Sequence, residues 1–158
     1  MAADYGPLIE DVNKMIQMNQ VYIAAVNTVM VAQKKRIFQD GKAANGSQIG
    51  QYGTKPISIA KDKQAKNTGK TYFKGGYREY KSLVGKGASF VNLRNTDQTM
   101  MDLGTTVSGN EYGIGFNNEF NANKMEWNET RFNKDISITS DAEDELFLNV
   151  VNFELNRQ

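Results

Sequence analysis

The stretch from Gln64 to Tyr77, QAKNTGKTYFKGGY, contains Gly69-Lys70-Thr71, the three residues that end a phosphate-binding P-loop. A P-loop also needs a glycine five positions before Gly69, and that position holds Gln64. It further needs a buried strand before it and a helix after it, whereas YFKGGY places paired glycines where the helix would begin. The sequence therefore argues against a nucleotide site, and this lysine-rich stretch needs another explanation.

Three groups of carboxylates could in principle hold a metal ion or exchange protons. The run Asp141–Glu145 lacks the alternating ligands and central glycine of a calcium loop, and it suits the first turn of a helix. Glu126 and Glu129 could pair as acid and base, but a polar helical stretch favours a solvated face. Asp97 and Asp102 are expected at helix ends. We therefore expect no catalytic residue, no metal and no cofactor.

The composition removes several classes of enzyme. The 158 residues include no cysteine and no histidine, which excludes disulfides, thiolate or imidazole metal sites and the usual catalytic triads. The net charge of +1 argues against a dedicated nucleic-acid binder. The start has no basic and apolar leader pattern, and no segment approaches the apolar length of a membrane span. We expect a non-enzymatic protein in a reducing, soluble compartment, without a membrane partner.

The first element that must position these residues is a long helix. Apolar residues from Leu8 to Ile37 recur at steps of three, four and seven, and this predicts a helix from about Pro7 to Gln39. Such a rod is about 45 Å long. We expect a single domain, residues 1–158, in which residues 1–40 form this helix.

The second element, residues 41–76, is predicted to be an extended arm. It is rich in glycine, lysine and small polar residues, with only isolated apolar ones. Loops of this length in compact domains are usually disordered or functional. Its own side chains are too few to hold it, so we expect a neighbouring subunit to do so.

Residues 77–158 are predicted to form an α+β body in which helices pack on a small antiparallel β-sheet. GYREYKSLVG predicts a helix that stops at Gly85, and TTVSGNEYGIGF predicts a hairpin. A helix is expected near Asn118–Phe132, with Trp127 among its aromatic anchors on the sheet, and a last helix after the Ser140 capping box. The other predicted elements are a helix in NTDQTMMDLG, capped by Asn95 or Thr96, and the strands SFVNL and DISIT. The further aromatic anchors are Phe116, Phe120 and Phe132.

Charge is segregated along the chain. Between Lys55 and Lys86 nine basic residues face two acidic ones, a net of +7, whereas from Asp97 onward twelve acidic residues face four basic ones, a net of −8. This pattern is expected of a subunit whose arm lies on the acidic surface of its neighbour. The predicted arm interface comprises Ile57, Ile59, Lys61, Lys63, Lys66, Lys70, Tyr72, Phe73 and Lys74. The predicted acidic docking surface comprises Glu119, Glu126, Glu129, Asp141, Glu143, Asp144 and Glu145.

The order of these features resembles a family over most of the chain. An amphipathic helix ending in RIFQDGKAANGSQIGQY is followed by GGYREYKSLVGKGASFVNLRNTDQTMMDL, a hairpin ending in YGIGF, a helix and ISITSDAEDEL. This order is similar to that of the virion-morphogenesis, or tail-completion, proteins of tailed bacteriophages. The sequence departs from that pattern at Asp97-Gln98, where the family often has glycine before methionine.

The resemblance implies a structural protein, without catalysis, that forms a ring in the neck between head and tail. It implies a tail-completion protein, tail terminator or head-completion adaptor, made in the host cytoplasm and located in the virion. Its partners would be its own copies and other neck, portal or tail proteins, with possible non-specific contact to DNA in the channel. The alternative reading is a nucleic-acid-binding protein without sequence preference that uses the basic segment 55–86. A third reading is a hydrolase that holds its metal with carboxylates alone.

Overall fold

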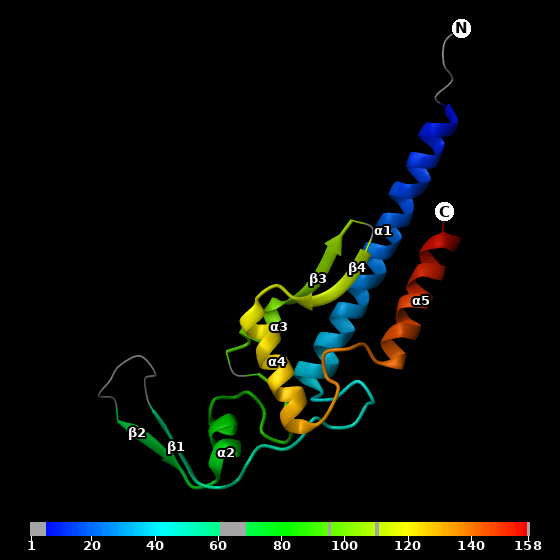
Figure 1. Cartoon of the computed structure of the whole chain (residues 1–158). Helices are drawn as coiled ribbons and strands as arrows, with labels where there is room; N and C mark the ends of the chain where they lie inside the picture. The colour runs from blue at the N-terminus through cyan, green and yellow to red at the C-terminus, as the bar shows by residue number, and fades with distance from the viewer. Residues whose placement is uncertain (1–5, 61–68, 95, 110, 158) are drawn as a thin grey trace.

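The structure is a computed structural model that describes residues 6–60, 69–94, 96–109 and 111–157, with side chains from Ile9 onward. The predicted α+β fold class is confirmed, and the strands form two separate two-stranded antiparallel sheets (Figure 1). The elements run in the order α1 (Gly6–Lys34), the short π-helix η1 (Lys35–Gln39), β1 (Ile57–Ala60), β2 (Lys70–Phe73), α2 (Gly76–Leu83), α3 (Gln98–Asp102), β3 (Leu103–Ser108), β4 (Glu111–Phe116), α4 (Glu119–Phe132) and α5 (Asp141–Asn156).

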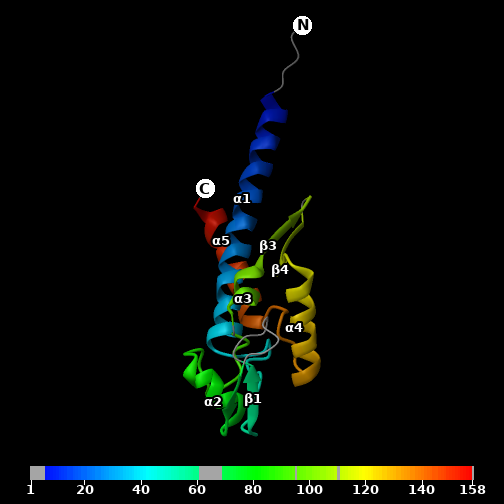
Figure 2. The ribbon, with the colours of Figure 1, turned by 90° about the vertical axis from the view of Figure 1, so that its left-hand side faces the viewer.

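The long helix α1 is confirmed, and it is the axis on which the other elements pack. Val21, Ala25 and Val29 lie four residues apart and are buried, while α5 runs beside them (Figures 1 and 2). The amino-terminal part of α1 extends beyond the carboxyl end of α5, and there the apolar residues from Ile9 to Ile16 are exposed. The predicted apolar face is therefore covered over only part of its length.

The hydrophobic core lies at the carboxyl end of α1, where η1, the hairpin β3–β4 and α4 meet. Four of its members lie in segments without helix or strand, namely Ala43, Ile49, Val91 and Ile136, and each of these four is at most 1% exposed. The remaining members are Ile37, Phe38, Leu103 and Met125. Irregular segments therefore supply half of this core.

The prediction that the extended arm begins at residue 41 is wrong. Ala43 and Ile49 belong to the core, because the chain from residue 41 to residue 50 folds back against the body. A side chain at Gly41 would come within 2.5 Å of the Val91 carbonyl oxygen, and one at Gly50 within 2.9 Å of the Phe132 ring. Within the predicted arm, only the hairpin β1–β2 projects from the body (Figures 1 and 2).

The predicted strands SFVNL and DISIT are also wrong, although Val91 and Ile136 are buried as expected. In the segment 136–138, buried side chains take the place of a partner strand. Glu129 accepts hydrogen bonds from the backbone N–H groups of Ile136 (2.8 Å) and Ser137 (2.7 Å). Arg36 donates to the carbonyls of Ile136 and Ile138, and Gln33 donates to that of Ser137. These side chains satisfy the carbonyls of residues 136–138 and two of their N–H groups without a β-ladder.

The remaining elements follow their local signals closely. The hairpin β3–β4 pairs from Leu103 opposite Phe116 to Ser108 opposite Glu111, and the helix near 118–132 has Asn118 as its N-cap. The capping box of Ser140 and Glu143 is present at the start of α5. The short helix α3 begins after Asp97, not after Asn95 or Thr96 as predicted; Asn95 lies outside the described residues.

Candidate assembly site

The β1–β2 hairpin is the part of the predicted arm that projects. The strands pair from Ile57 opposite Phe73 to Ala60 opposite Lys70, at the end of the molecule opposite the start of α1 (Figures 1 and 2). Lys70 and Tyr72 share one face, because they are two residues apart in a strand, and Tyr72 is 60% exposed. Ile57 and Ile59 share the other face and are half-buried. The hairpin thus offers one face with lysine and tyrosine and one with two isoleucines.

The structure divides the predicted arm residues into three groups. Lys70, Tyr72 and Lys74 are exposed as an interface would require. Phe73 is buried, with its ring edge-on to that of Tyr80 on α2 at 5.6 Å, so its assignment to the interface between subunits is wrong. Phe73 instead anchors the hairpin to its own chain. The predicted residues Lys61, Lys63 and Lys66 lie outside the described residues.

A chain of aromatic rings fixes the base of the hairpin. From Phe73 and Tyr80 it continues through Tyr77 to Tyr52, with ring centroids 5.4 Å and 5.5 Å apart at the last two steps. The Tyr52 hydroxyl donates to the Asn92 side-chain oxygen at 2.9 Å, and burial raises the pKa of Tyr52. The hairpin is therefore attached to the body through packed rings and not through a flexible linker.

Two of the nine basic residues between positions 55 and 86 face inward. Lys81 is 1% exposed, its ammonium lies 5.1 Å from the centroid of the Tyr52 ring, and burial lowers its pKa to about 8. Lys86 pairs with Asp97 at 2.5 Å, and Arg94 pairs with the same carboxylate at 2.9 Å. The hydrogen bond from Arg94, followed by that from Lys86, holds the pKa of Asp97 well below its usual range. These charges stabilise the body and are not available to a partner.

Two members of the predicted acidic docking surface are also wrong. Glu143 is 4% exposed, and its carboxylate accepts from the Arg36 guanidinium at 2.8 Å, so that the pair joins η1 to α5. Glu129 is half-buried and accepts three hydrogen bonds from the segment that includes Ser137. Both carboxylates are committed to their own chain. The other five predicted members, Glu119, Glu126, Asp141, Asp144 and Glu145, are exposed.

The outer face of α4 carries aromatic residues that were expected to anchor this helix. Trp127 is 59% exposed and Phe120 is 66% exposed, so the prediction that they pack on the sheet is wrong. Arg131 covers the Trp127 ring and Lys124 covers the Phe120 ring, at 5.1 Å and 4.6 Å from the ring centroids. Phe116 and Phe132, predicted to have the same role, do pack against the core.

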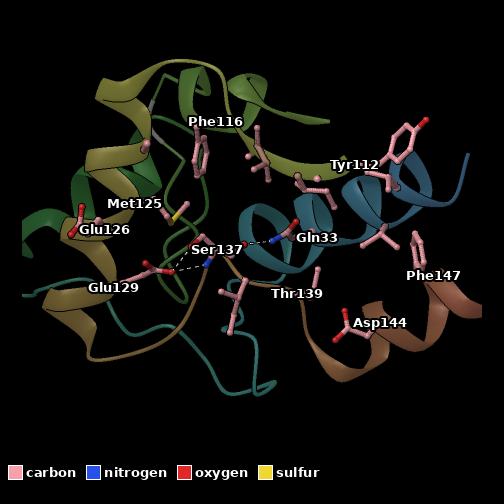
Figure 3. A pocket seen from close by; sticks show the side chains of 18 residues that line it. Gln33, Tyr112, Phe116, Met125, Glu126, Glu129, Ser137, Thr139, Asp144 and Phe147 are labelled. Atoms are coloured by element: carbon pink, nitrogen blue, oxygen red, sulfur yellow. Dashed lines mark hydrogen bonds between the residues drawn. The ribbon is translucent and has the colours of Figure 1, made fainter. Parts of the chain in front are cut away.

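A groove of about 590 Å³ opens between α1, β4, α4 and α5 (Figure 3). Its floor is α1, one wall is β4 and the opposite wall is the segment 137–139 with the start of α5. Glu126 and Asp144, two of the predicted docking residues, lie along it. Most of its remaining lining is apolar, as expected of binding sites of this size. Its principal apolar members are Val26, Val29, Ile114, Phe116, Met125 and Phe147.

Gln33 on the floor of the groove has an unsatisfied oxygen. Its side chain is 1% exposed, its amide nitrogen donates to the Ser137 carbonyl, and its Oε1 has no hydrogen-bond donor among the described residues (Figure 3). A buried acceptor without a donor costs about 1–3 kcal/mol. The floor of the groove thus contains one buried acceptor that the described residues leave unpaired.

The Gly-Lys-Thr motif lies in a strand and not at the start of a helix. Lys70 and Thr71 are the first two residues of β2, so the context that a P-loop requires is not present there. No group of three or more acidic side chains within the described ranges is arranged to hold a metal ion. None of the helices that the structure describes is both long and apolar enough to cross a membrane.

Comparison of the chain with protein-family models, with curated proteins and with solved structures finds no match.

Sequence reasoning missed Gln33 and Arg36, the residues on which the groove and the segment 136–138 depend. The available signal was their position on the predicted first helix, because Val26, Val29, Gln33 and Arg36 recur at steps of three and four. Polar residues at predicted core positions are buried and need hydrogen-bond partners. The stretch KKR was instead interpreted only as a favourable charge at the helix end.

Proposed function

We propose that this chain is a structural subunit that assembles into a ring at the head–tail junction of a tailed bacteriophage. The observation that carries the proposal is the projection of two elements from opposite ends of the body, the β1–β2 hairpin and the amino-terminal part of α1 (Figures 1 and 2). Exposed apolar residues on a rigid projecting element are typical of surfaces that another molecule covers. The proposal includes no catalytic step.

The two projecting elements suit a head-to-tail contact between identical subunits. In a closed ring each subunit presents two different surfaces, one to each neighbour. The hairpin carries exposed lysines, and α4 and α5 carry exposed carboxylates at Glu126, Asp141 and Asp144. Attraction between such surfaces would favour one orientation of assembly. The family resemblance, based on the order of sequence features, supplies the placement in the neck.

The partners in this proposal are other copies of the chain and the neighbouring neck, portal or tail proteins. The particular role is tail completion, tail termination or head completion. In each case the protein is made in the host cytoplasm and acts in the virion, where the hairpin can also approach DNA in the channel.

The test is the solution mass and negative-stain images of the purified protein, compared with a variant in which Ile57–Lys74 is replaced by a short glycine-serine linker. We expect rings for the parent and monomers with unchanged far-UV circular dichroism for the variant, because α1 and the core do not depend on the hairpin. Assembly of the variant to the same extent as the parent would contradict the role given to the arm.

A second candidate function is nucleic-acid binding without sequence preference. Lys70 and Tyr72 favour it, because a cation and an exposed ring on one strand face could contact a phosphate and a base. Lys81 and Lys86 weaken it, because both face inward. Fluorescence anisotropy with labelled single-stranded and duplex DNA separates the readings, since a binder must show an affinity that falls steeply with added salt.

A further inference from the structure

The strand β4 lines the groove with its backbone as well as with its side chains. Five consecutive residues, from Tyr112 to Phe116, line the groove. Alternate residues of a strand point to opposite faces, so five in a row mark an exposed edge. Gly113 and Gly115 have no side chain, so only their main chain can contribute. Among the described strands β4 pairs only with β3, which leaves this edge without a partner.

The opposite wall is the irregular segment 137–139, in which the chain bends at Ser137 and Ile138 (Figure 3). A free strand edge above an apolar floor is a site to which an extended segment can add as a further β-strand. The Gln33 side chain lines the floor, and its buried Oε1 has no donor among the described residues. The free edge of β4 and the apolar floor thus indicate an extended occupant.

We propose that this groove receives the β1–β2 hairpin of a neighbouring copy, with β1 pairing along the free edge of β4. This inference rests on the proposed ring assembly and names the surface that the arm occupies. The hairpin of the same chain projects away from β4 and α5 in both views, so the proposed occupant comes from another copy (Figures 1 and 2).

The dimensions and the side chains of the hairpin fit the groove. The strand β1 has four residues, and the open stretch of β4 has five. Ile57 and Ile59 lie on one face of β1 and are only half-buried in their own chain, so they can enter the apolar floor. One face of the inserted strand is thus apolar, and its backbone supplies the N–H donors.

Charge complementarity supports the same occupant. Lys55, Lys70 and Lys74 flank the strands of the hairpin and are exposed. Glu126 and Asp144 lie along the groove and are exposed as well. An inserted hairpin would bring the three cations toward the two carboxylates, and their attraction would favour this position.

The absence of cysteine allows a direct test by cross-linking, because any disulfide must join introduced thiols. Copies with Ile59→Cys are mixed with copies that carry Thr139→Cys on the groove wall, and the mixture is oxidised. We expect disulfide-linked dimers. A matched control uses Thr106→Cys, which is exposed on β3 and outside the groove, and we expect at least about tenfold less dimer with it.

A charge reversal provides an independent measurement. Asp144 and Glu145 are adjacent on α5 and both are exposed, but only Asp144 lines the groove. We expect Asp144→Lys to weaken assembly by at least about tenfold, and Glu145→Lys to change it by less than about threefold. Adding Lys70→Glu to Asp144→Lys should restore part of the loss. Circular dichroism confirms that each variant is folded.

The outcomes separate this inference from the proposed function. If sedimentation shows oligomers but Ile59→Cys links to Thr139→Cys no better than to Thr106→Cys, the groove assignment is overturned and ring assembly stands. If Ile16→Cys on α1 links to Thr139→Cys in place of Ile59→Cys, the groove holds a helix and the assignment is again overturned. If the chain is monomeric and no pair forms a link, both proposals are wrong.

Discussion

The buried ion pair between Arg36 and Glu143 allows the most quantitative prediction, for the substitution Glu143→Ala. The side chains are 10% and 5% exposed, and Arg36 Nε lies 2.8 Å from the carboxylate. Removing one partner of such a pair leaves an uncompensated charge in the interior and costs about 3–5 kcal/mol. The substitution also removes the acceptor of the Ser140 N–H, which closes the capping box at 2.8 Å.

Other contacts of Arg36 reduce this cost and the lost cap increases it. Its guanidinium also donates to the carbonyls of Lys42, Ile136 and Ile138, and these acceptors remain in the variant. They place the cost of the lost pair near the lower end of the range, and the lost capping contact adds about 0.5–1 kcal/mol. We therefore expect a loss of about 3–5 kcal/mol in the free energy of unfolding, from a total of about 5–15 kcal/mol.

The assay is urea unfolding followed by far-UV circular dichroism at one fixed protein concentration, because assembly would make the apparent stability depend on concentration. Glu145→Ala is the matched control: it lies two residues further on the same helix, is exposed, and should cost no more than about 0.5 kcal/mol. A double-mutant cycle with Arg36→Ala should show that the second substitution costs less than the first. A loss below about 1 kcal/mol for Glu143→Ala, or one equal to the control, would refute the reasoning.

Three further substitutions test the base of the hairpin and its charges. Gly76→Ala should destabilise the fold by at least about 1–3 kcal/mol more than Gly85→Ala in urea unfolding. Both residues have positive φ, but only at Gly76 would a side chain come within 2.7 Å of a carbonyl oxygen, that of Gly53. Equal losses of stability would contradict this contact. The pKa of Asp97 is depressed in the folded state, so its stabilisation is present above about pH 4 and is lost as the pH falls. The stability advantage of the parent over Asp97→Asn should therefore shrink between about pH 6 and pH 3, and a constant difference would argue against it. Lys81 has a folded-state pKa of about 8, below the unfolded value of about 10.4, so the unfolded chain binds its proton more tightly. The parent should then gain at most about 3 kcal/mol of stability relative to Lys81→Met as the pH rises from about 8 to about 10. A stability difference that does not change with pH would refute the burial of this charge.

The features that the sequence predicted well are those encoded by neighbouring residues. The capping box at Ser140 and the turn at Gly85 each depend on residues within four positions, and both are present. The hairpin β3–β4 follows from alternating residues on both sides of a short turn. Local rules sufficed because each of these contacts closes within one turn of the chain.

The features that it did not predict depend on contacts between distant parts of the chain. The segment 136–138 has the composition of a strand, but its backbone partners are Gln33 and Arg36, about a hundred positions earlier. A count of charges likewise assigns every carboxylate to the surface, whereas Glu143 is buried because Arg36 lies opposite it. Isolated apolar residues such as Ala43 gave no periodic signal, although the core includes them.

The distribution of charge between interior and surface gives the candidate site its specificity. The charges that lock the body in place are paired or buried within it, as Arg36 with Glu143 and Lys86 with Asp97 show. The lysines that flank the hairpin strands and the carboxylates along the groove, among them Asp144, form no ion pair within the described residues and remain exposed. In the proposed assembly, their attraction would act between copies. The same near-neutral chain would then use paired charges to stabilise its own fold and exposed charges to favour one ordered contact with the next subunit.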